Sequence, residues 1–437
     1  MDWMSSYFCR AALGGSNIQM YSVLETSENR DLITSEQPNT IDEIYHADVK
    51  LAEHFEGKMM LASFLTRKIV SFQESKDKPA YRWYKYKEAF SASLVEYFLC
   101  SYEGGVTGKI LDPFAGAGTT LFAASAMGLS ADGIELLLIG QEIIRSRLCL
   151  EEEFTAGDRA ILERWIRERL WKTSKERRTL NTLRITNGAY PPETIDAIEQ
   201  YLGALEKENE KIQLVLRFTL LCILESISYT RKDGQYLRWD YRSNRQRGSK
   251  SFNKGKILGF DIAITAKLKE ILADVSIADE ELTFFPVNQI KGSVQLFKGS
   301  CLDIMPTLKA ESYDAILTSP PYCNRYDYTR TYALELALLG MNDKNVINLR
   351  QQMLSCTVEN RDKDLLKRFP HWSVATDAAN RQRLLQLILF YLDTQREQGK
   401  LNNNGIPRMV RGYFYEMAYV MEECLRVLKP NARLFMV

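Results

Sequence analysis

Residues 109–120 read Lys109-Ile110-Leu111-Asp112-Pro113-Phe114-Ala115-Gly116-Ala117-Gly118-Thr119-Thr120. The apolar run at the start predicts a buried strand, and the residues after it predict a glycine-rich turn and then a helix from Thr119 to Met127. Glycine permits a tight turn and lets a ligand come close to the backbone, so this arrangement is typical of nucleotide-like ligands at the carboxyl edge of a parallel sheet. A plain structural turn is the competing interpretation.

An acidic residue ends the next predicted strand, residues 130–135. Glu135 stands close to the position at which dinucleotide-binding folds place the carboxylate that accepts the two ribose hydroxyls. The helix that begins at Thr119 can present free backbone N–H groups to ligand oxygens. No Gly-Lys-Ser or Gly-Lys-Thr follows the glycine turn, which excludes a Walker phosphate loop. Taken alone, Glu135 also fits a solvated acid at a strand end.

A second sharp turn follows another predicted strand, residues 313–317, and reads Thr318-Ser319-Pro320-Pro321-Tyr322. The two prolines fix the backbone and therefore fix where the preceding carbonyl groups point. Rigid acceptors at the hydrogens of an exocyclic nucleobase amine can draw its delocalised lone pair back onto nitrogen, and Tyr322 can stack on an extruded base. A proline-stiffened turn without chemistry is the alternative.

Together, the two motifs resemble those of the S-adenosylmethionine-dependent amino-methyltransferases of DNA, which modify adenine N6 or cytosine N4. Residues 112–120 match the cofactor loop of that family, and residues 318–322 match its catalytic loop in the serine form typical of N4-cytosine enzymes. The resemblance covers about 84–140, 294–340 and 413–437. It implies an α/β fold: a Rossmann-like class I methyltransferase sheet with large, mainly helical insertions.

The resemblance also implies roles for individual residues, with S-adenosylmethionine as the expected cofactor. The expected catalytic residues are Ser319, Pro320, Pro321 and Tyr322. The expected cofactor-binding residues are Phe90, Ser91, Asp112, Pro113, Phe114, Ala115, Gly116, Gly118, Thr119, Glu135 and Asp303. Glu135 is expected to hold the ribose and Asp303 to approach the adenine. Methyl transfer is expected to be direct and in-line, without a covalent enzyme intermediate.

Residues 140–290 are predicted to be mostly helical, and a stretch within them, 229–256, is rich in basic and aromatic side chains. Basic groups interleaved with aromatic rings suit a phosphate backbone and unstacked bases, so DNA is the expected partner. The expected nucleic-acid-binding residues are Arg231, Lys232, Arg238, Trp239, Arg242 and Arg245, followed by Arg325 and Arg330 after the catalytic loop. For the last two, helix capping with solvated arginines is an equal alternative.

Composition limits the class of protein and its compartment. The chain has 437 residues, with hydrophobic and charged contents of 45% and 26%, which are ordinary for a soluble globular protein. Its net charge of +1 does not by itself indicate a protein that binds polyanions over its whole surface. Its eight cysteines form no Cys-x-x-Cys pair and it has only three histidines, which argues for a reducing compartment and against a structural metal. We find no secretory leader and no apolar run long enough for a membrane span, so a cytoplasmic location is expected.

The pattern divides the chain into six expected segments. They are 1–78 of unknown role, 79–140 as the cofactor-binding half of the core, 141–290 as a helical insertion and candidate target-recognition region, 291–340 as the catalytic half, 341–410 as a second insertion, and 411–437 as a core helix and strand. Sheets of this family normally continue further, so the sequence predicts a sheet incomplete at the C-terminus, open to completion by a second polypeptide.

The base that is modified stays open at this stage. Cytosine N4 is favoured in a restriction-modification or phage-defence setting, with an N6-adenine enzyme, an RNA amine methyltransferase or a noncatalytic nucleic-acid-binding subunit as alternatives. Cytosine C5 methylation requires a thiolate, usually from a Pro-Cys pair in relatives of this family, and the sequence contains no Pro-Cys. Cys323 is expected to be a small buried neighbour of Tyr322.

Overall fold

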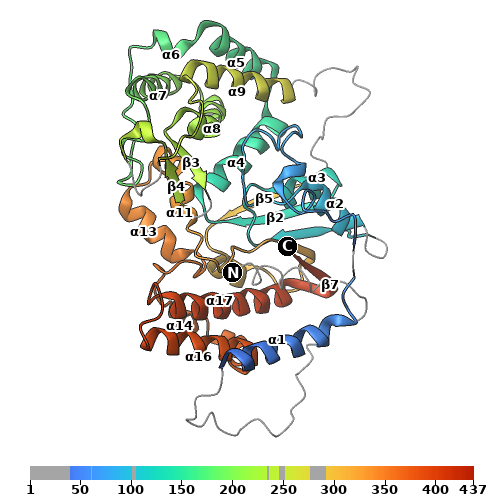
Figure 1. Ribbon diagram of the computed structural model, residues 1–437. Helices are drawn as coiled ribbons and strands as arrows, with labels where there is room; N and C mark the ends of the chain where they lie inside the picture. The colour runs from blue at the N-terminus through green and yellow to red at the C-terminus, as the bar shows by residue number, and fades with distance from the viewer. Residues whose placement is uncertain (1–39, 61, 101–104, 234–235, 246–250, 276–291) are drawn as a thin grey trace.

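A computed structural model describes residues 40–60, 62–100, 105–233, 236–245, 251–275 and 292–437 (Figure 1). Residues 1–39 of the expected N-terminal segment therefore lie outside the described residues. A central sheet lies between a helical body at the top of Figure 1 and a second group of helices at the bottom. None of the helices described is long and apolar enough to cross a membrane.

The centre of the molecule is a five-stranded parallel sheet. Its strands are β1 (Lys109–Asp112), β2 (Ser130–Glu135), β5 (Val294–Lys298), β6 (Tyr313–Thr318) and β7 (Leu428–Met436). They lie in the order β5-β2-β1-β6-β7. The predicted Rossmann-like α/β fold is confirmed. From β1 the chain proceeds to one side through β2 and β5, and afterwards to the other side through β6 and β7, so β1 and β6 form a topological switch point.

Both faces of the sheet are buried at the central strands β1 and β6, which explains why these two strands read as apolar runs. Ile110 and Leu111 are neighbours on β1, and both are fully buried, but they point to opposite faces and belong to different cores. The core of Ile110 includes α2 (Ala92–Cys100) and α3 (Thr119–Ala126). The core of Leu111 includes α4 (Leu138–Leu148) and α17 (Ile406–Val427).

The chain between β2 and β5 forms the helical body at the top of Figure 1. Its helices are α5 (Ala156–Glu168), α6 (Leu170–Thr173), α7 (Pro192–Leu205), α8 (Glu210–Ile227) and α9 (Phe260–Val275). A two-stranded antiparallel hairpin, β3 (Thr230–Asp233) and β4 (Tyr236–Trp239), projects from it towards the sheet. The sequence indicated the basic and aromatic character of this stretch but not its strands.

The chain between β6 and β7 supplies most of the remaining helices. They are α11 (Tyr328–Thr331), α12 (Ala333–Leu338), α13 (Asp343–Gln352), α14 (Leu365–Arg368), α15 (Ser373–Arg381), α16 (Arg383–Glu397) and α17. A short helix, α10 (Cys301–Ile304), follows β5. Helix α1 (Thr40–Glu56) packs against α16 at the bottom of Figure 1.

One helix begins later in the chain than the sequence predicts. In the sequence, apolar and aromatic residues recur at helical spacing from Tyr84 to Leu99, which predicts a helix over this range. In the structure, α2 begins only at Ala92. Ser91 caps it, because the Leu94 N–H donates to Ser91 Oγ at 3.2 Å. The aromatic residues before the cap are buried by distant segments: Tyr86, for example, stacks on Tyr332 with ring centroids 5.2 Å apart. Their spacing therefore reflects tertiary burial rather than one face of a helix.

The packing between α3 and β2 generates the first prediction. A Cβ atom at Gly133 would lie 2.7 Å from Leu121 Cδ1 and 2.9 Å from Ala115 Cβ. Gly133→Ala should therefore lower the free energy of unfolding by about 1–3 kcal/mol through overpacking, measured by urea denaturation. Gly57→Ala, where a Cβ atom meets nothing within 4 Å, is the matched control. Equal stability of the two variants would contradict this close helix–strand approach.

Candidate active site

The two sharp turns singled out in the sequence meet because β1 and β6 are hydrogen-bonded neighbours. Ile110 pairs with Ala315 and Leu111 pairs with Ile316 in parallel register. The carboxyl ends of both strands therefore lie at the same edge of the sheet, at the switch point where α/β folds bind ligands. The glycine turn leaves β1 there, and the Pro-Pro turn leaves β6 there.

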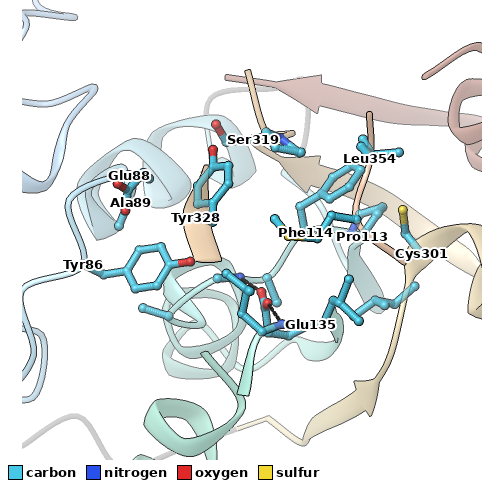
Figure 2. Close-up of a pocket in the computed structure, with 18 of the residues that line it drawn as sticks. Tyr86, Glu88, Ala89, Pro113, Phe114, Glu135, Cys301, Ser319, Tyr328 and Leu354 are labelled. Atoms are coloured by element: carbon cyan, nitrogen blue, oxygen red, sulfur yellow. Dashed lines mark hydrogen bonds between the residues drawn. The ribbon is translucent and has the colours of Figure 1, made fainter. Parts of the chain in front are cut away.

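An open cavity lies at this edge, and both turns line it (Figure 2). The sequence-predicted residues on its wall are Phe90, Pro113, Phe114, Ala115, Gly116, Thr119, Glu135, Ser319 and Pro321. Figure 2 shows Tyr86 and Tyr328 on one side of the space, Phe114 and Leu354 on the other, and Glu135 below them. Residues about two hundred positions apart in the chain thus face a single space.

Glu135 ends β2 with its carboxylate turned into the glycine turn. The backbone N–H groups of Gly116 and Leu137 donate to its two oxygens, each at 2.6 Å. Burial raises the pKa of Glu135 to about 8, although these two hydrogen bonds favour the ionised form and oppose the shift. The remaining lone pairs of the carboxylate are available to a ligand with hydroxyl groups.

Asp112 joins the two turns from below the cavity rather than lining it. Its Oδ1 accepts hydrogen bonds from the Phe114 N–H at 3.0 Å and from Thr318 Oγ1 at 2.6 Å. The side chain is buried, and burial raises its pKa to about 6 against these hydrogen bonds. Asp112 therefore fixes the start of the glycine turn against the last residue of β6.

The two glycines of the first turn have different structural demands. Gly116 has a φ of +54° and Gly118 a φ of +80°, both in the left-handed region that glycine adopts without strain. A Cβ atom at Gly118 would lie 2.8 Å from Ile144 Cγ1, so this residue allows close packing of α3 on α4. Gly116 instead lines the cavity, beside the ring of Tyr86.

The Pro-Pro turn is held by polar contacts to the last strand and to α17. Ser319 Oγ donates to the Val437 carbonyl at 3.0 Å, and the Tyr413 hydroxyl donates to the Pro321 carbonyl at 2.7 Å. Pro320 is buried beneath the turn. Tyr322 is 48% exposed, so its ring is free to contact a large partner.

Several residues on the cavity wall were not assigned to it from the sequence. They are Tyr86, Glu88, Leu136, Leu137, Cys301, Tyr328, Met353 and Leu354. Leu136 and Leu137 directly follow the end of β2, and this position could have assigned them to the site. Glu88 accepts hydrogen bonds from the hydroxyls of Tyr326 and Tyr332, which come from the segment after the Pro-Pro turn. No sequence pattern links these distant residues.

Four predicted cofactor residues do not line the cavity: Asp112 and Gly118, whose contacts are described above, and Asp303 and Ser91. Asp303 is exposed and forms an ion pair with Arg368 at 2.5 Å, whereas Cys301, two residues earlier, is on the wall. Ser91 is buried, and its hydroxyl donates to the Ile69 carbonyl at 2.5 Å while capping α2. Among the described residues, no group of three or more His, Cys, Asp or Glu side chains could hold a metal ion.

The predicted nucleic-acid-binding residues of the hairpin region have unequal surroundings. Arg231 and Arg238 are exposed on one face of the hairpin, and Arg238 pairs with Asp233 at 3.1 Å. Lys232 is buried with its counter-ion Glu335, so the expectation that it contacts nucleic acid does not fit its place in the fold.

Two other arginines of this region mainly stabilise their own loop. Arg242 forms two hydrogen bonds to Asp240, at 2.7 and 3.0 Å. Arg245 donates to the carbonyl groups of Arg184 and Ile185 and lies over the ring of Trp239.

The two predicted nucleic-acid-binding arginines that follow the Pro-Pro turn, Arg325 and Arg330, differ in their contacts. Arg330 pairs with Asp327 at 3.1 Å and with Glu359 at 2.6 Å, which favours the capping interpretation for this residue. Arg325 is exposed, has a φ of +66°, and has a long 3.4 Å contact from its guanidinium to Asn402. A positive φ in a non-glycine residue is uncommon and carries strain.

Proteins of assigned function that are similar in sequence indicate the class of this protein. The sequence is 52% identical to the Type II methyltransferase M.AvaI of Nostoc sp., over 97% of this chain and 87% of that relative, and equally to the M.AvaI of Anabaena variabilis. It is 36% identical to the Type II methyltransferase M.BsoBI of Geobacillus stearothermophilus, over 85% of this chain and 76% of that relative. No protein-family model matches the sequence, and no solved structure matches the fold.

A methyltransferase is thus the class of protein that this sheet and cavity define. At these identities and coverages the chain belongs to the Type II methyltransferases, which methylate DNA in restriction-modification systems.

Proposed function

We propose that this protein transfers a methyl group from S-adenosylmethionine to an exocyclic amino group of a flipped DNA base, with cytosine N4 as the favoured target. The observation that carries the proposal is the shared cavity: the glycine turn after β1 and the Ser-Pro-Pro turn after β6 face one space. Similarity to M.AvaI and M.BsoBI supports methyl transfer, and the Ser-Pro-Pro-Tyr turn supports an amine as the acceptor.

The cavity wall fits the chemistry of S-adenosylmethionine. Phe114, Pro113 and Leu354 give an apolar surface for a purine ring, and Glu135 can accept hydrogen bonds from ribose hydroxyls. Glu88 supplies a second carboxylate on the wall, suited to the ammonium group of the methionine moiety. When bound, this cofactor supplies a methyl group already activated by its sulfonium charge.

The protein's own residues then position and stabilise the acceptor. The rigid turn at Ser319 and Pro320 offers oxygen acceptors to the hydrogens of the base amine, and it stabilises the positive charge that develops on nitrogen. Tyr322, exposed next to the turn, can stack on the extruded base. Because binding and orientation supply the catalysis, no protein nucleophile is needed.

The thiol nearest to the catalytic turn does not suit cytosine C5 chemistry. Cys323 follows Tyr322 directly, and burial raises the pKa of its thiol to about 12. It is therefore protonated at neutral pH, whereas attack on cytosine C6 requires a thiolate. This supports transfer to an exocyclic amine, with adenine N6 as the alternative to cytosine N4.

DNA is proposed to approach over the hairpin and the catalytic turn. Arg231 and Arg238 face solvent on the hairpin, and Tyr236 between them in the sequence is 55% exposed. Exposed cations beside an aromatic ring suit phosphates and unstacked bases.

The similar proteins give no support to the expected second polypeptide, and we do not retain it. A cytoplasmic location and the six expected segments stay predictions.

Gly116→Val should weaken binding of S-adenosylhomocysteine by about 100-fold, measured by calorimetry, because a branched side chain at positive φ adds strain and fills the cavity. Gly128→Val is the matched control: its φ is +85°, but a Cβ atom there meets nothing within 4 Å and the residue does not line the cavity. Equal binding by the two variants would remove Gly116 from the site.

The raised pKa of Glu135 predicts a pH dependence of cofactor binding. Its carboxylate form, which accepts hydroxyl hydrogens, becomes predominant only as the pH rises through about 8. S-adenosylhomocysteine affinity should therefore increase between pH 6 and 8, by up to about tenfold per pH unit. Glu135→Gln should bind more weakly at pH 8 and lose this dependence. A parallel pH profile in wild type and variant would show that Glu135 does not titrate in the site.

The reaction itself is tested in cells. DNA from a methylation-deficient bacterium that expresses this chain should contain N4-methylcytosine, detected by mass spectrometry of its nucleosides. Tyr322→Ala should reduce the modification at least about tenfold, because stacking on the flipped base is lost, with unchanged S-adenosylhomocysteine affinity. Tyr45→Ala, which alters an exposed tyrosine on α1, should behave as wild type. N6-methyladenine instead would select the alternative base, and neither product would refute the function.

A further inference from the structure

The β3–β4 hairpin has two faces with opposite environments. Arg231 pairs with Arg238 across the strands, and Lys232 pairs with Leu237. The arginine pair is exposed and the lysine pair is buried. Since neighbouring residues of a strand point to opposite faces, the hairpin offers arginines to solvent and a lysine to the protein interior.

Lys232 is enclosed by groups from the core. Its Nζ lies 2.6 Å from Glu335 Oε1 on α12 and 2.8 Å from the Tyr84 hydroxyl, which itself donates to Glu335 at 3.0 Å. The ammonium group also lies over the ring of Tyr332, 4.7 Å from its centroid. The side chains of Lys232 and Glu335 are only 4% and 1% exposed.

This ion pair is a costly way to attach a hairpin. Two charges lose their hydration, and the gain from their attraction exceeds that cost only when all remaining polar atoms are satisfied. Glu335 Oε2 is buried, and no hydrogen-bond partner for it is found among the described residues. An apolar pair of similar size would serve stability at least as well, which leaves a fixed geometry as the advantage of the charged pair.

The same cluster borders the cofactor cavity. Tyr332 stacks on Tyr86 at an interplanar angle of 16°, and its hydroxyl donates to Glu88. Tyr86 and Glu88 both line the cavity. Lys87, between them in the sequence, donates to the backbone carbonyl of Lys232. The inner face of the hairpin therefore contacts the layer of residues whose other side forms the cavity wall.

We propose that Lys232 is a positioning residue for methyl transfer. Paired with Glu335 and packed on Tyr332, its ammonium group holds the arginine-bearing hairpin at a fixed distance and angle from the cavity. DNA phosphates bound on the outer face are thereby aligned with the catalytic turn. This inference rests on the proposed function, because it assigns the hairpin a part in presenting DNA to that reaction.

The test replaces the charged pair by an apolar pair. Lys232→Met alone leaves Glu335 buried without its counter-ion, so the informative variant is Lys232→Met/Glu335→Leu. Tyr84→Phe is a second, milder variant, which keeps the ring and removes the hydroxyl that joins Lys232 to Glu335. Lys211→Met is the control, because it breaks an ion pair with Asp158 that is not part of the cavity wall.

Each full-length variant is assayed with unmethylated phage DNA and labelled S-adenosylmethionine, and its melting temperature and S-adenosylhomocysteine affinity are measured separately. We expect the double variant to lower kcat at least about tenfold. Tyr84→Phe, which removes the two hydrogen bonds of the hydroxyl to Lys232 and Glu335, should lower it about fivefold. KM for DNA and cofactor affinity should change less than about threefold. Arg231→Ala/Arg238→Ala should show the opposite split, a raised KM with little change in kcat.

A merely structural role predicts a different result. The folded double variant, or Tyr84→Phe if the double variant does not fold, would then retain wild-type kcat, and this outcome overturns the proposal. A fall in kcat matched by an equal fall in cofactor affinity overturns it as well, because the cavity itself would be damaged. Wild-type protein that binds S-adenosylhomocysteine but methylates no DNA refutes the proposed function, which is distinguishable from either result.

Discussion

The parallel pairing of β1 with β6 is the constraint on which the rest of this structure depends. It brings the carboxyl ends of two strands, far apart in the chain, to one edge of the sheet. The Asp112 carboxylate then joins the two turns, accepting hydrogen bonds from Phe114 and from Thr318. Without this pairing, the glycine turn and the Pro-Pro turn would be two ordinary loops, because neither forms a cavity alone.

The two long insertions place further residues around this edge of the sheet. The segment between β2 and β5 packs its hairpin, through Lys232, on the layer of residues behind the cavity wall. The segment after β6 contributes Tyr328 and Leu354 to the wall itself. The residues from the second segment cover part of a space that the sheet leaves open. A site assembled in this way can combine a ligand cavity at the sheet edge with a surface for a much larger partner.

Features that depend on adjacent residues could be predicted from the sequence, whereas features that depend on contacts between distant residues could not. The strands around Ile110 and Ile316 and the helix after Gly118 were predictable, since two-sided burial gives continuous apolar runs and glycine marks a sharp turn. The helix expected from Tyr84 was wrong because those aromatic residues are buried by distant segments. Lys232 was predicted to bind nucleic acid together with its basic neighbours, because composition does not distinguish the two faces of a hairpin.

The sequence by itself determined the class of fold, the glycine turn and the rigid Pro-Pro turn, since each follows from the conformational limits of a few adjacent residues. Only the tertiary structure decided that these turns share one cavity, that Glu88 and Tyr86 line it, and that Asp303 does not. The physical reason is that strand pairing and burial join residues separated by long insertions, and such contacts leave no mark in local sequence.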